Sequence, residues 1–402
     1  MAGCDQPGLL PFEQALAELL DQVVVSSNTE TIYIEQAVGR VLAKQSYAVV
    51  NVPPADNSSM DGYAVDARSI KPNVLYKVSQ RIAAGKAPEP LDSGTVARIF
   101  TGAEMPEGAN AVVMQEDVAV RDDGVIFRAA VCAQKNVRQA GQDIKKGDPV
   151  LAAGTRLQPA DLGVLASTGL DNLEVIRPLK VAILSTGDEL VDPGQSLSPG
   201  QIYNSNRYVL IGLLKQMGME PVVMSRVEDS LDATIDALTD AAKRADCVIS
   251  TGGVSVGEED HVRNAIESLG KVNLWRLKMK PGKPLAFGHI NETPFFGLPG
   301  NPASTLITFC LLARPFLLAM QGVTQQRCLS YQLPAGFSQS AGSRQEYVRV
   351  RLEQGKLVAF GNQSSGVLSS ASWADGLAVI PPETSVSIGD MLTFLPFTEL
   401  LG

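Results

Sequence analysis

Four glycine- and proline-rich turns in the middle of the chain carry residue types that bind anions. Each follows a strand-like apolar run, and they span 185–189, 251–260, 280–283 and 299–304. Glycines let backbone N–H groups approach an anion closely, and lysines in these turns add full positive charge. Because ligands bind at the carboxyl ends of the strands in an open α/β sheet, we expect the four turns to converge on one crevice.

Acidic side chains in the same turns could hold a divalent cation. They are Asp188, Glu189, Glu258, Glu259 and Asp260. Carboxylates combined with phosphate oxygens are ligands that Mg²⁺ prefers. The patterns GxxxxGK[ST] and GxGxxG are both absent, so the usual signatures of a P-loop and of a dinucleotide-binding site are missing.

The elements around these turns predict a mostly parallel α/β sheet covered on both faces. Strands alternate with helices, which is typical of that architecture. The expected strands are 181–184, 221–224, 247–250, 272–278, 284–287 and 294–298, and the expected helices are 206–217, 230–244, 258–269 and 302–320. Either Asp229 or Ser230 can cap the second of these helices.

Two β-rich regions and a discontinuous helical region flank the α/β pattern. Short apolar runs between Gly, Pro and Asp residues predict strands before and after it, and helical periodicity marks 12–23, 35–44 and 159–167. We therefore expect a linking N-terminal domain, an inserted β-rich domain, an α/β domain and a C-terminal domain that resembles a β-barrel. The linking domain is expected over 1–45 and 148–177, and the inserted domain over 46–147. The α/β domain is expected over 178–326 and the C-terminal domain over 327–402.

The composition argues against several classes of protein. Lys and Arg total 34 against 43 Asp and Glu, so a net charge of −9 disfavours a nucleic-acid coat or a polybasic membrane binder. The five scattered cysteines lack a Cys-x-x-Cys spacing and there are two histidines, so we expect any metal to be a hard cation on oxygen ligands. The N-terminus does not resemble a signal peptide, and the apolar run 306–320 contains Arg314 and Pro315 and is too short to span a bilayer. We expect a cytoplasmic protein.

Several motifs, in order along the chain, resemble the molybdopterin molybdenumtransferase family. The sequence DNSSMDGYA at 56–64 is similar to the family signature DNSAMDGYA. The other matching motifs are TGA at 101–103, MQE at 114–116, STGDEL at 185–190, GGVSVG at 252–257, KPGKP at 280–284 and LPGNP at 298–302. The family includes bacterial MoeA and the E domains of gephyrin and of a plant homologue, and the resemblance extends from Pro11 to the C-terminus.

The resemblance implies an activity and an assembly. Family members insert molybdate into adenylylated molybdopterin, AMP leaves, and the molybdenum cofactor is formed. They are elongated four-domain homodimers, whose site lies between the α/β domain of one subunit and the inserted β domain of the other. We expect Mg²⁺ as cofactor and the adenylyltransferase that makes the substrate as a pathway partner, with no binding to nucleic acid or membrane.

Carried over motif by motif, the resemblance implies individual site residues. The expected catalytic residues are Asp61, Thr101, Asp143, Glu189, Asp229, Asp260 and Lys280, of which Asp61, Glu189 and Asp260 are candidate metal ligands. The expected substrate-binding residues are Arg138, Thr186, Gly187, Gly252, Gly253, Ser255, Arg276, Lys283, Pro299, Pro302, Arg349 and Ser365. Asp61, Thr101 and Asp143, with Arg138 nearby, would come from the partner subunit.

Some positions depart from the family pattern. Gln142 stands where many members carry a glutamate, Arg276 stands where lysine is common, and 363–366 reads QSSG where a Gln-Gly-Ser pattern is more usual. Simpler interpretations also stay open. Asp61 precedes a glycine and could build an Asx turn, and the histidines and tryptophans could serve packing alone.

Two other functions are compatible with parts of the sequence. The adenylyltransferase that activates molybdopterin shares the α/β fold but lacks the full-length β-rich domains. A scaffold that clusters receptors, as gephyrin does, is accompanied by a long linker that this sequence lacks. The choice between molybdate and tungstate also stays open, because lysine and arginine do not readily distinguish the two oxyanions.

Overall fold

A six-stranded sheet forms the centre of the α/β domain in the computed structural model, which describes residues 9–225, 227, 228, 230–252, 261–324 and 328–401. In spatial order the strands are β15 (Glu220–Val223), β12 (Lys180–Ser185), β16 (Cys247–Thr251), β20 (Thr293–Leu298), β19 (Pro284–Ile290) and β17 (Gly270–Arg276). The first four are parallel to one another, and β19 runs antiparallel to both of its neighbours. The mostly parallel sheet predicted from the sequence is confirmed.

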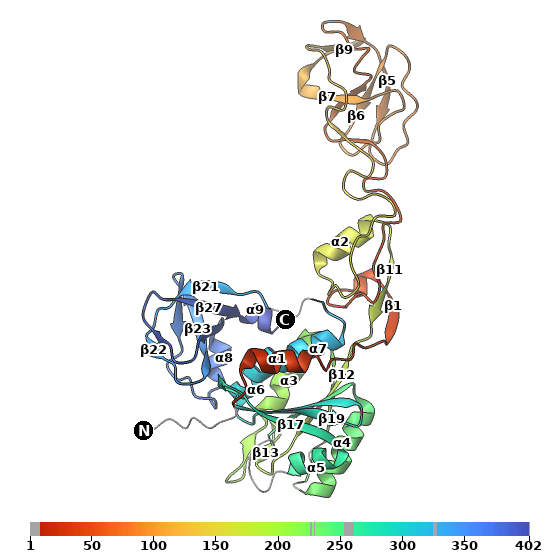
Figure 1. The fold of residues 1–402 in the computed structure, drawn as a ribbon. Coiled ribbons are helices and arrows are strands. Elements are labelled where there is room, and N and C mark those ends of the chain that lie inside the picture. The colour runs from red at the N-terminus through yellow and green to blue at the C-terminus, as the bar shows by residue number, and fades with distance from the viewer. Residues whose placement is uncertain (1–8, 226, 229, 253–260, 325–327, 402) are drawn as a thin grey trace.

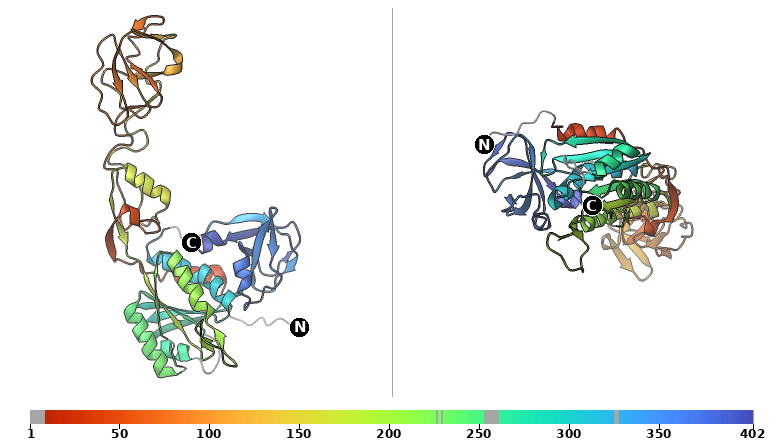
Figure 2. Two further views of the ribbon diagram at one scale, coloured as in Figure 1. Left: turned by 180° about the vertical axis from the view of Figure 1, so that it is seen from behind. Right: turned by 90° about the horizontal axis from the view of Figure 1, so that it is seen from below.

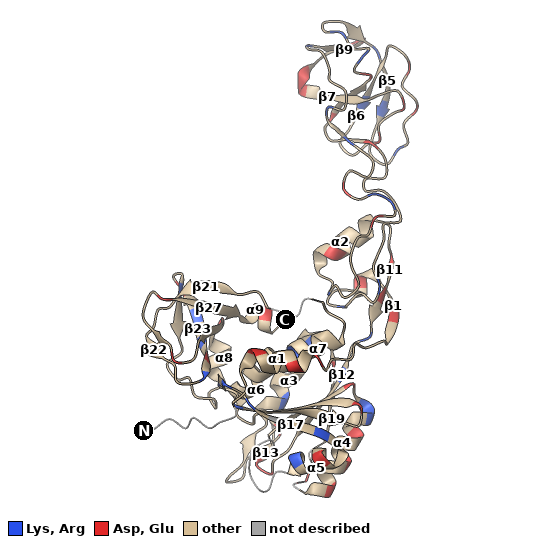
Figure 3. Cartoon of the chain, viewed as in Figure 1, with Lys and Arg blue, Asp and Glu red and all other residues tan. Residues whose placement is uncertain are grey.

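Helices cover both faces of this sheet (Figure 1). One hydrophobic cluster contains residues of α3 (Ser205–Gln216), and the other contains residues of α4 (Leu231–Arg244) and α5 (His261–Leu269). Ser230 is the N-cap of α4, because its side chain accepts a hydrogen bond from the Ala233 N–H at 3.3 Å. Acidic and basic side chains are interspersed along α4 and α5, as expected for helices with one face in solvent (Figure 3).

A long buried helix follows β20. It consists of α6 (Pro302–Thr308), a π-helical segment (Phe309–Ala313) and α7 (Arg314–Met320), so it continues through Pro315. The wide turn immediately before the proline accommodates its missing N–H. Within the described residues this is one helix whose length and composition would allow it to cross a membrane, in contrast to the expectation from 306–320. Its apolar window is wholly buried inside the structure, so it is a core helix.

The linking domain is built from segments on both sides of the inserted domain. Strand β1 (Thr29–Tyr33) pairs antiparallel with β11 (Asn172–Ile176), and α2 (Pro159–Ser167) packs beside them with the predicted bounds. The helix predicted over 35–44 is wrong. A single 3₁₀ turn (Ile34–Gln36) is followed by Gly39 at φ +77°, and the chain then extends so that Leu42 bridges Val175.

The first helix of the chain packs with the α/β domain. The domain bounds predicted from the sequence assign it to the linking domain instead. This helix, α1 (Phe12–Leu20), contacts α7, and its Ala15 and Leu19 belong to the main hydrophobic cluster of the α/β domain. Leu10 also bridges Leu277 there. Residues 9 to about 24 therefore belong structurally to the α/β domain.

The inserted domain is β-rich and lies at the far end of the elongated molecule (Figures 1 and 2). Its strands form a four-stranded sheet, a three-stranded sheet and a two-stranded pair. They are β2 (Asn57–Ser58), β3 (Gly62–Val65), β4 (Leu75–Tyr76), β5 (Val78–Ile82), β6 (Val96–Ile99), β7 (Ala111–Met114), β8 (Val118–Arg121), β9 (Gly124–Phe127) and β10 (Val137–Arg138).

The C-terminal domain lies beside the α/β domain (Figure 1). Its elements are β21 (Tyr331–Pro334), β22 (Gln339–Ser340), β23 (Gln345–Glu353), β24 (Lys356–Ala359), α8 (Ser369–Trp373), β25 (Gly376–Ile380), β26 (Ser385–Val386), β27 (Met391–Pro396) and α9 (Phe397–Leu400). The N–H of Gly336 donates to the Leu357 carbonyl at 2.8 Å, which brings the end of β21 to β24 and curls the sheet as expected for a barrel-like domain. Strand β18 (Met279–Lys280) joins this sheet parallel to β23 and ties the two domains together.

Candidate active site

A cavity of about 840 Å³ lies at the carboxyl ends of β12, β16 and β20. All four turns singled out in the sequence contribute to its lining, which confirms that they converge on one crevice. The candidate residues that line it are Thr186, Glu189, Gly252, Lys280, Lys283, Pro299, Pro302 and Ser365. Parallel strands end at the same edge of the sheet, so turns that are far apart in the sequence meet there.

Three cationic side chains line the cavity within the described part of the chain. They are Lys280, Lys283 and Arg344. Lys280 is the last residue of β18, Lys283 lies in the turn that follows it, and Arg344 immediately precedes β23. Because β18 pairs with β23, the same strand pairing brings Lys280 and Arg344 to one wall. Such a concentration of positive charge, in a chain with a net charge of −9, indicates a site for an anion.

Lys280 has a specific partner in this wall. Its Nζ donates to Oε1 of Glu346 at 2.9 Å, and the other carboxylate oxygen of Glu346 accepts from Nε2 of Gln339 at 2.6 Å. The lysine side chain is 49% exposed, whereas the Glu346 side chain is 8% exposed. The resting charge of Lys280 is therefore balanced from behind by a buried carboxylate.

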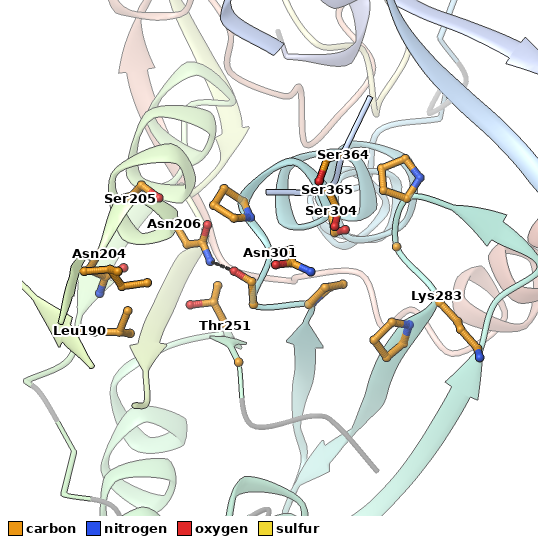
Figure 4. A pocket seen from close by; sticks show the side chains of 18 of the residues that line it. Leu190, Asn204, Ser205, Asn206, Thr251, Lys283, Asn301, Ser304, Ser364 and Ser365 are labelled. Atoms are coloured by element: carbon orange, nitrogen blue, oxygen red, sulfur yellow. Dashed lines mark hydrogen bonds between the residues drawn. The ribbon is translucent and has the colours of Figure 1, made fainter. Parts of the chain in front are cut away.

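Uncharged asparagine and threonine side chains form another part of the lining. Asn206 donates from Nδ2 to the Gly300 carbonyl at 2.7 Å, which connects α3 to the turn after β20 (Figure 4). Asn204 caps α3 by accepting from the Arg207 N–H at 3.2 Å. Thr251 Oγ1 and Asn206 Oδ1 are buried and have no hydrogen-bond partner among the described residues. Buried unpaired polar atoms are rare and are often found at functional sites.

Glu189 is the one carboxylate among the described residues that line the cavity. It packs over Gly187, where φ is +131° and an added Cβ would lie 2.4 Å from the Glu189 carboxylate. Gly187 thus makes room for this carboxylate rather than lining the cavity itself. The described residues contain no cluster of three His, Cys, Asp or Glu side chains that could hold a metal ion. One carboxylate is nevertheless enough when substrate phosphates supply the remaining oxygen ligands of Mg²⁺.

Arg349 supports the cavity from behind and does not line it, in contrast to the substrate-binding role predicted for it. It is 1% exposed, and it donates from Nη2 to the Ser364 carbonyl and from Nε to Ser370 Oγ, both at 3.0 Å. Burial lowers the pKa of its guanidinium to about 10. The loop that it supports reaches the cavity through Ser365, whose carbonyl accepts from the Ala303 N–H. Arg276, at the end of β17, is also absent from the lining.

The candidate residues of the inserted domain lie far from this cavity within one chain (Figure 1). Oδ1 of Asp61 accepts hydrogen bonds from the N–H and the hydroxyl of Thr101, at 2.8 and 2.9 Å. These bonds, with a smaller contribution from the positive charge of Arg98, hold the pKa of Asp61 below its ordinary value. Arg138 and Asp143 are exposed on the same domain.

Some other positions singled out in the sequence lie either in a turn of the inserted domain or outside the described residues. Gln142, which departs from the family pattern, accepts a hydrogen bond from the Gln139 N–H at 3.2 Å and so stabilises its own turn. The remaining candidates lie outside the described residues. They are Asp229, Gly253, Ser255 and Asp260, together with Glu258 and Glu259.

Comparisons with known proteins agree with this geometry. The MoeA N-terminal region (domains I and II) matches residues 10–169, a probable molybdopterin binding domain matches 182–319, and the MoeA C-terminal region (domain IV) matches 333–397. The molybdopterin molybdenumtransferase of Haemophilus influenzae is 38% identical, over 98% of this chain and 100% of the relative. This chain belongs to the molybdopterin molybdenumtransferase family.

Further relatives support membership of the molybdopterin molybdenumtransferase family, whose members are transferases. The protein of that name from Nostoc sp. is 35% identical over 95% of this chain and 92% of its own length. Two crystal structures of the molybdopterin biosynthesis MoeA protein of Pyrococcus horikoshii have TM-scores of 0.82 and 0.84 with this chain. They are 32% and 28% identical, and they cover 97% and 96% of this chain and 99% and 100% of their own.

Several residues near or in the cavity are not among the site residues predicted individually from the sequence, although Thr251 and Ser304 lie within two of the turns singled out there. They are Asn204, Asn206, Thr251, Ser304, Arg344, Gln363 and Ser364, with Glu346 behind Lys280. Thr251 could have been found, because it directly precedes the first glycine of a turn already singled out. Arg344 and Glu346 gave no such signal, since their relation to the cavity depends on how the C-terminal sheet meets β18.

Proposed function

We propose that this chain inserts molybdate into adenylylated molybdopterin, with release of AMP, to form the molybdenum cofactor. The observation that carries the proposal is the cavity lined by Lys280, Lys283 and Arg344 in a member of this family. Molybdate is a tetrahedral dianion, and the phosphoanhydride of the substrate carries further negative charge. Charge-assisted hydrogen bonds from these three side chains would compensate that charge and hold the two substrates together.

The chain's own residues would act by binding and orientation. The dithiolene sulfurs of the substrate would replace oxo ligands of molybdate, which take up protons and leave as water. A further water would hydrolyse the phosphoanhydride, so that AMP leaves. Asn206, Thr251 and Thr186 offer uncharged polar groups to the remainder of the substrate. Glu189 would hold Mg²⁺ together with phosphate oxygens, and the ion would supply polarisation of the phosphoanhydride. Asp61 and Thr101 would complete the site from another subunit.

A homodimer is part of this proposal. The Asp61–Thr101 pair lies at the far end of the same chain, so both halves can meet only if a second copy supplies one of them. Exposed apolar side chains are also frequent in the sequence between residues 24 and 50, and we propose that they contribute to the surface between the two copies. They are Val24, Val25, Tyr33, Val38, Tyr47, Val49 and Val50.

The proposed activity is tested by measuring the release of AMP. Purified protein, given adenylylated molybdopterin and Mg²⁺, should release AMP when molybdate is added. The matched control omits molybdate, and a second control replaces molybdate with tungstate to test which oxyanion is accepted. Absence of AMP in every condition would contradict the proposal.

The alternative adenylyltransferase activity is tested in the same preparation. Formation of adenylylated molybdopterin from ATP and molybdopterin would favour it. The inserted and C-terminal β domains, which match the MoeA regions, favour the molybdenum-insertion step instead. The adenylyltransferase would then be a pathway partner that supplies the substrate, and both proteins would act in the cytoplasm.

A further inference from the structure

The ammonium of Lys280 is already engaged before any ligand arrives. It lines the cavity and is half-exposed, yet its Nζ donates to Glu346 at 2.9 Å. Glu346 lies behind the wall on β23, in register with Lys280 on β18. The buried carboxylate therefore does not line the cavity itself, and it contacts Lys280, which does.

Glu346 is held firmly in this position. Its second carboxylate oxygen accepts from Gln339 Nε2 at 2.6 Å, and the residue is 6% exposed. A carboxylate this deeply buried is tolerated when it is paired and hydrogen-bonded, and Lys280 and Gln339 meet both needs. The pair is asymmetric, because Lys280 can be solvated without Glu346, whereas Glu346 depends on Lys280.

We propose that Glu346 is an internal counter-ion of the oxyanion site, a positioning residue that holds Lys280 and sets how tightly the cavity binds its anion. The inference rests on the proposed function, in which Lys280 contacts molybdate or phosphate. The ammonium has three N–H donors, so one can stay on Glu346 while the others turn to the ligand. The carboxylate then fixes the lysine, but it also repels the anion that binds the same ammonium.

The size of this repulsion follows from the geometry. An oxyanion bound to Nζ would lie about 5–6 Å from the Glu346 carboxylate, the span of two charge-assisted hydrogen bonds. At an effective dielectric of about 40, between the value near a protein surface and that of water, removing one negative charge at that separation strengthens the binding of a unit negative charge roughly tenfold. A counter-ion of this kind keeps the oxyanion exchangeable, as a site that must hand its cargo to another molecule requires.

The central experiment measures molybdate binding by calorimetry in Glu346→Gln and in wild type. The variant keeps the shape of the side chain and removes its charge. We expect the Kd for molybdate to fall roughly tenfold, and we expect this gain to shrink at high salt. Glu353→Gln is the matched control: it removes the same charge from an exposed position of β23, about 23 Å further along the strand. Its Kd should stay within about twofold of wild type because salt screens charges at that distance.

A second set of variants separates this role from a purely structural one. Lys280→Ala should weaken molybdate binding about ten- to a hundredfold. It should also lower the Tm more than Glu346→Gln does, because it leaves a buried carboxylate with Gln339 alone. In Lys280→Ala/Glu346→Gln the Tm should recover, and the affinity gain from Glu346→Gln should fall to about twofold or less, since the counter-ion acts through the lysine.

The outcomes are distinguishable. An unchanged or weaker affinity in folded Glu346→Gln overturns the proposal, because a structural pair would loosen the site when broken. Glu346→Met is a second neutral replacement, and failure of both variants to fold would also overturn it. If wild type binds no molybdate, the anion site of the proposed function fails as well. If wild type binds molybdate and releases AMP while Glu346→Gln shows no gain, the counter-ion role alone is wrong.

Discussion

Neighbouring residues compensate charge differently in the two halves of the proposed site. In the α/β half, Lys280 is paired with a buried carboxylate. In the inserted domain, Asp61 is stabilised by two neutral donors of Thr101, with Arg98 nearby. Arg98 itself donates to the Gly62 carbonyl at 2.9 Å and lies over the Phe100 ring. Asp61 is therefore held in its ionised form by short contacts within its own domain, before any partner approaches.

Thr101→Val should raise the pKa of Asp61 toward its ordinary value. The variant removes the hydroxyl donor and keeps the backbone N–H donor, so part of the depression should remain. A carboxyl with a lowered pKa in the folded state contributes stability above its unfolded pKa, and that contribution is lost as the pH falls through the folded pKa. The effect of Thr101→Val on stability should accordingly be full near neutral pH, begin to decrease below about pH 4, and vanish only once the pH lies below the lowered pKa of Asp61 in the wild type.

Carboxyl titration by NMR tests this prediction directly. Thr95→Val is a suitable control, since Thr95 is a half-buried threonine of the same domain whose hydroxyl donates to Ser79 Oγ and to the Asp92 carbonyl instead. An unchanged Asp61 titration in Thr101→Val would show that the hydroxyl bond does not govern the carboxyl.

Turns between elements, rather than the elements themselves, decide the shape of the cavity. The turn that follows β18 carries Gly282 at φ +104°, and a Cβ added there would lie 2.4 Å from Thr308 Oγ1 on α6. Gly300 lines the same cavity, but a Cβ there would meet its nearest described atom, Gly252 Cα, at an ordinary 3.7 Å. The two glycines therefore differ in what they tolerate, although the sequence presents both in proline-glycine pairs.

Gly282→Ala should destabilise the chain and weaken anion binding, whereas Gly300→Ala should be tolerated. The strained backbone alone costs about 1–3 kcal/mol, and the contact with Thr308 adds to it. Relief requires a shift of the turn that carries Lys280 and Lys283, so the molybdate affinity should fall along with the stability. Urea unfolding and calorimetry measure both effects. Equal behaviour of the two alanine variants would contradict this account of the turn.

At the scale of the whole molecule, the extended shape separates residues that the proposed chemistry needs together. The inserted domain stands away from the cavity at the end of the linking domain (Figures 1 and 2). A composite site predicts complementation between variants. Asp61→Ala and Lys280→Ala chains, each inactive alone, should regain part of the AMP-release activity when mixed dimers form, because one site per dimer keeps both residues.

The measurement needs two readouts. Analytical ultracentrifugation should show a homodimer for the wild type, and differently tagged chains should report mixed dimers. In the control, the Asp61→Ala chain is replaced by a second Lys280→Ala chain that carries a different tag. This mixture should show no recovery of AMP-release activity. Mixed dimers that form but stay as inactive as either parent would show that the site is not shared between subunits.

Much of the α/β domain followed from local patterns in the sequence. Apolar runs such as 181–184 and 247–250 form strands because they are buried on both faces, and α2 has its predicted bounds because Pro159 and Gly169 mark its ends. The convergence of the four turns was also predictable, because parallel strands place their carboxyl ends at one edge. These features depend on residues close together in the chain, whose periodicity is visible without a structure.

Other features depended on contacts between distant segments. The 35–44 region has helical periodicity, but the turn at Gly39 and pairing with residues more than a hundred positions away draw it into an extended form. Arg349 has the type and position of a ligand-binding residue, yet the fold uses it to hold the Ser364 loop. Lys280 and Glu346 are 66 positions apart, and they meet only because the C-terminal sheet takes up β18. The sequence alone determined which residue types gather at the sheet edge. The docking of domains decided which charges are free to meet a ligand, because burial and pairing are properties of the packed molecule.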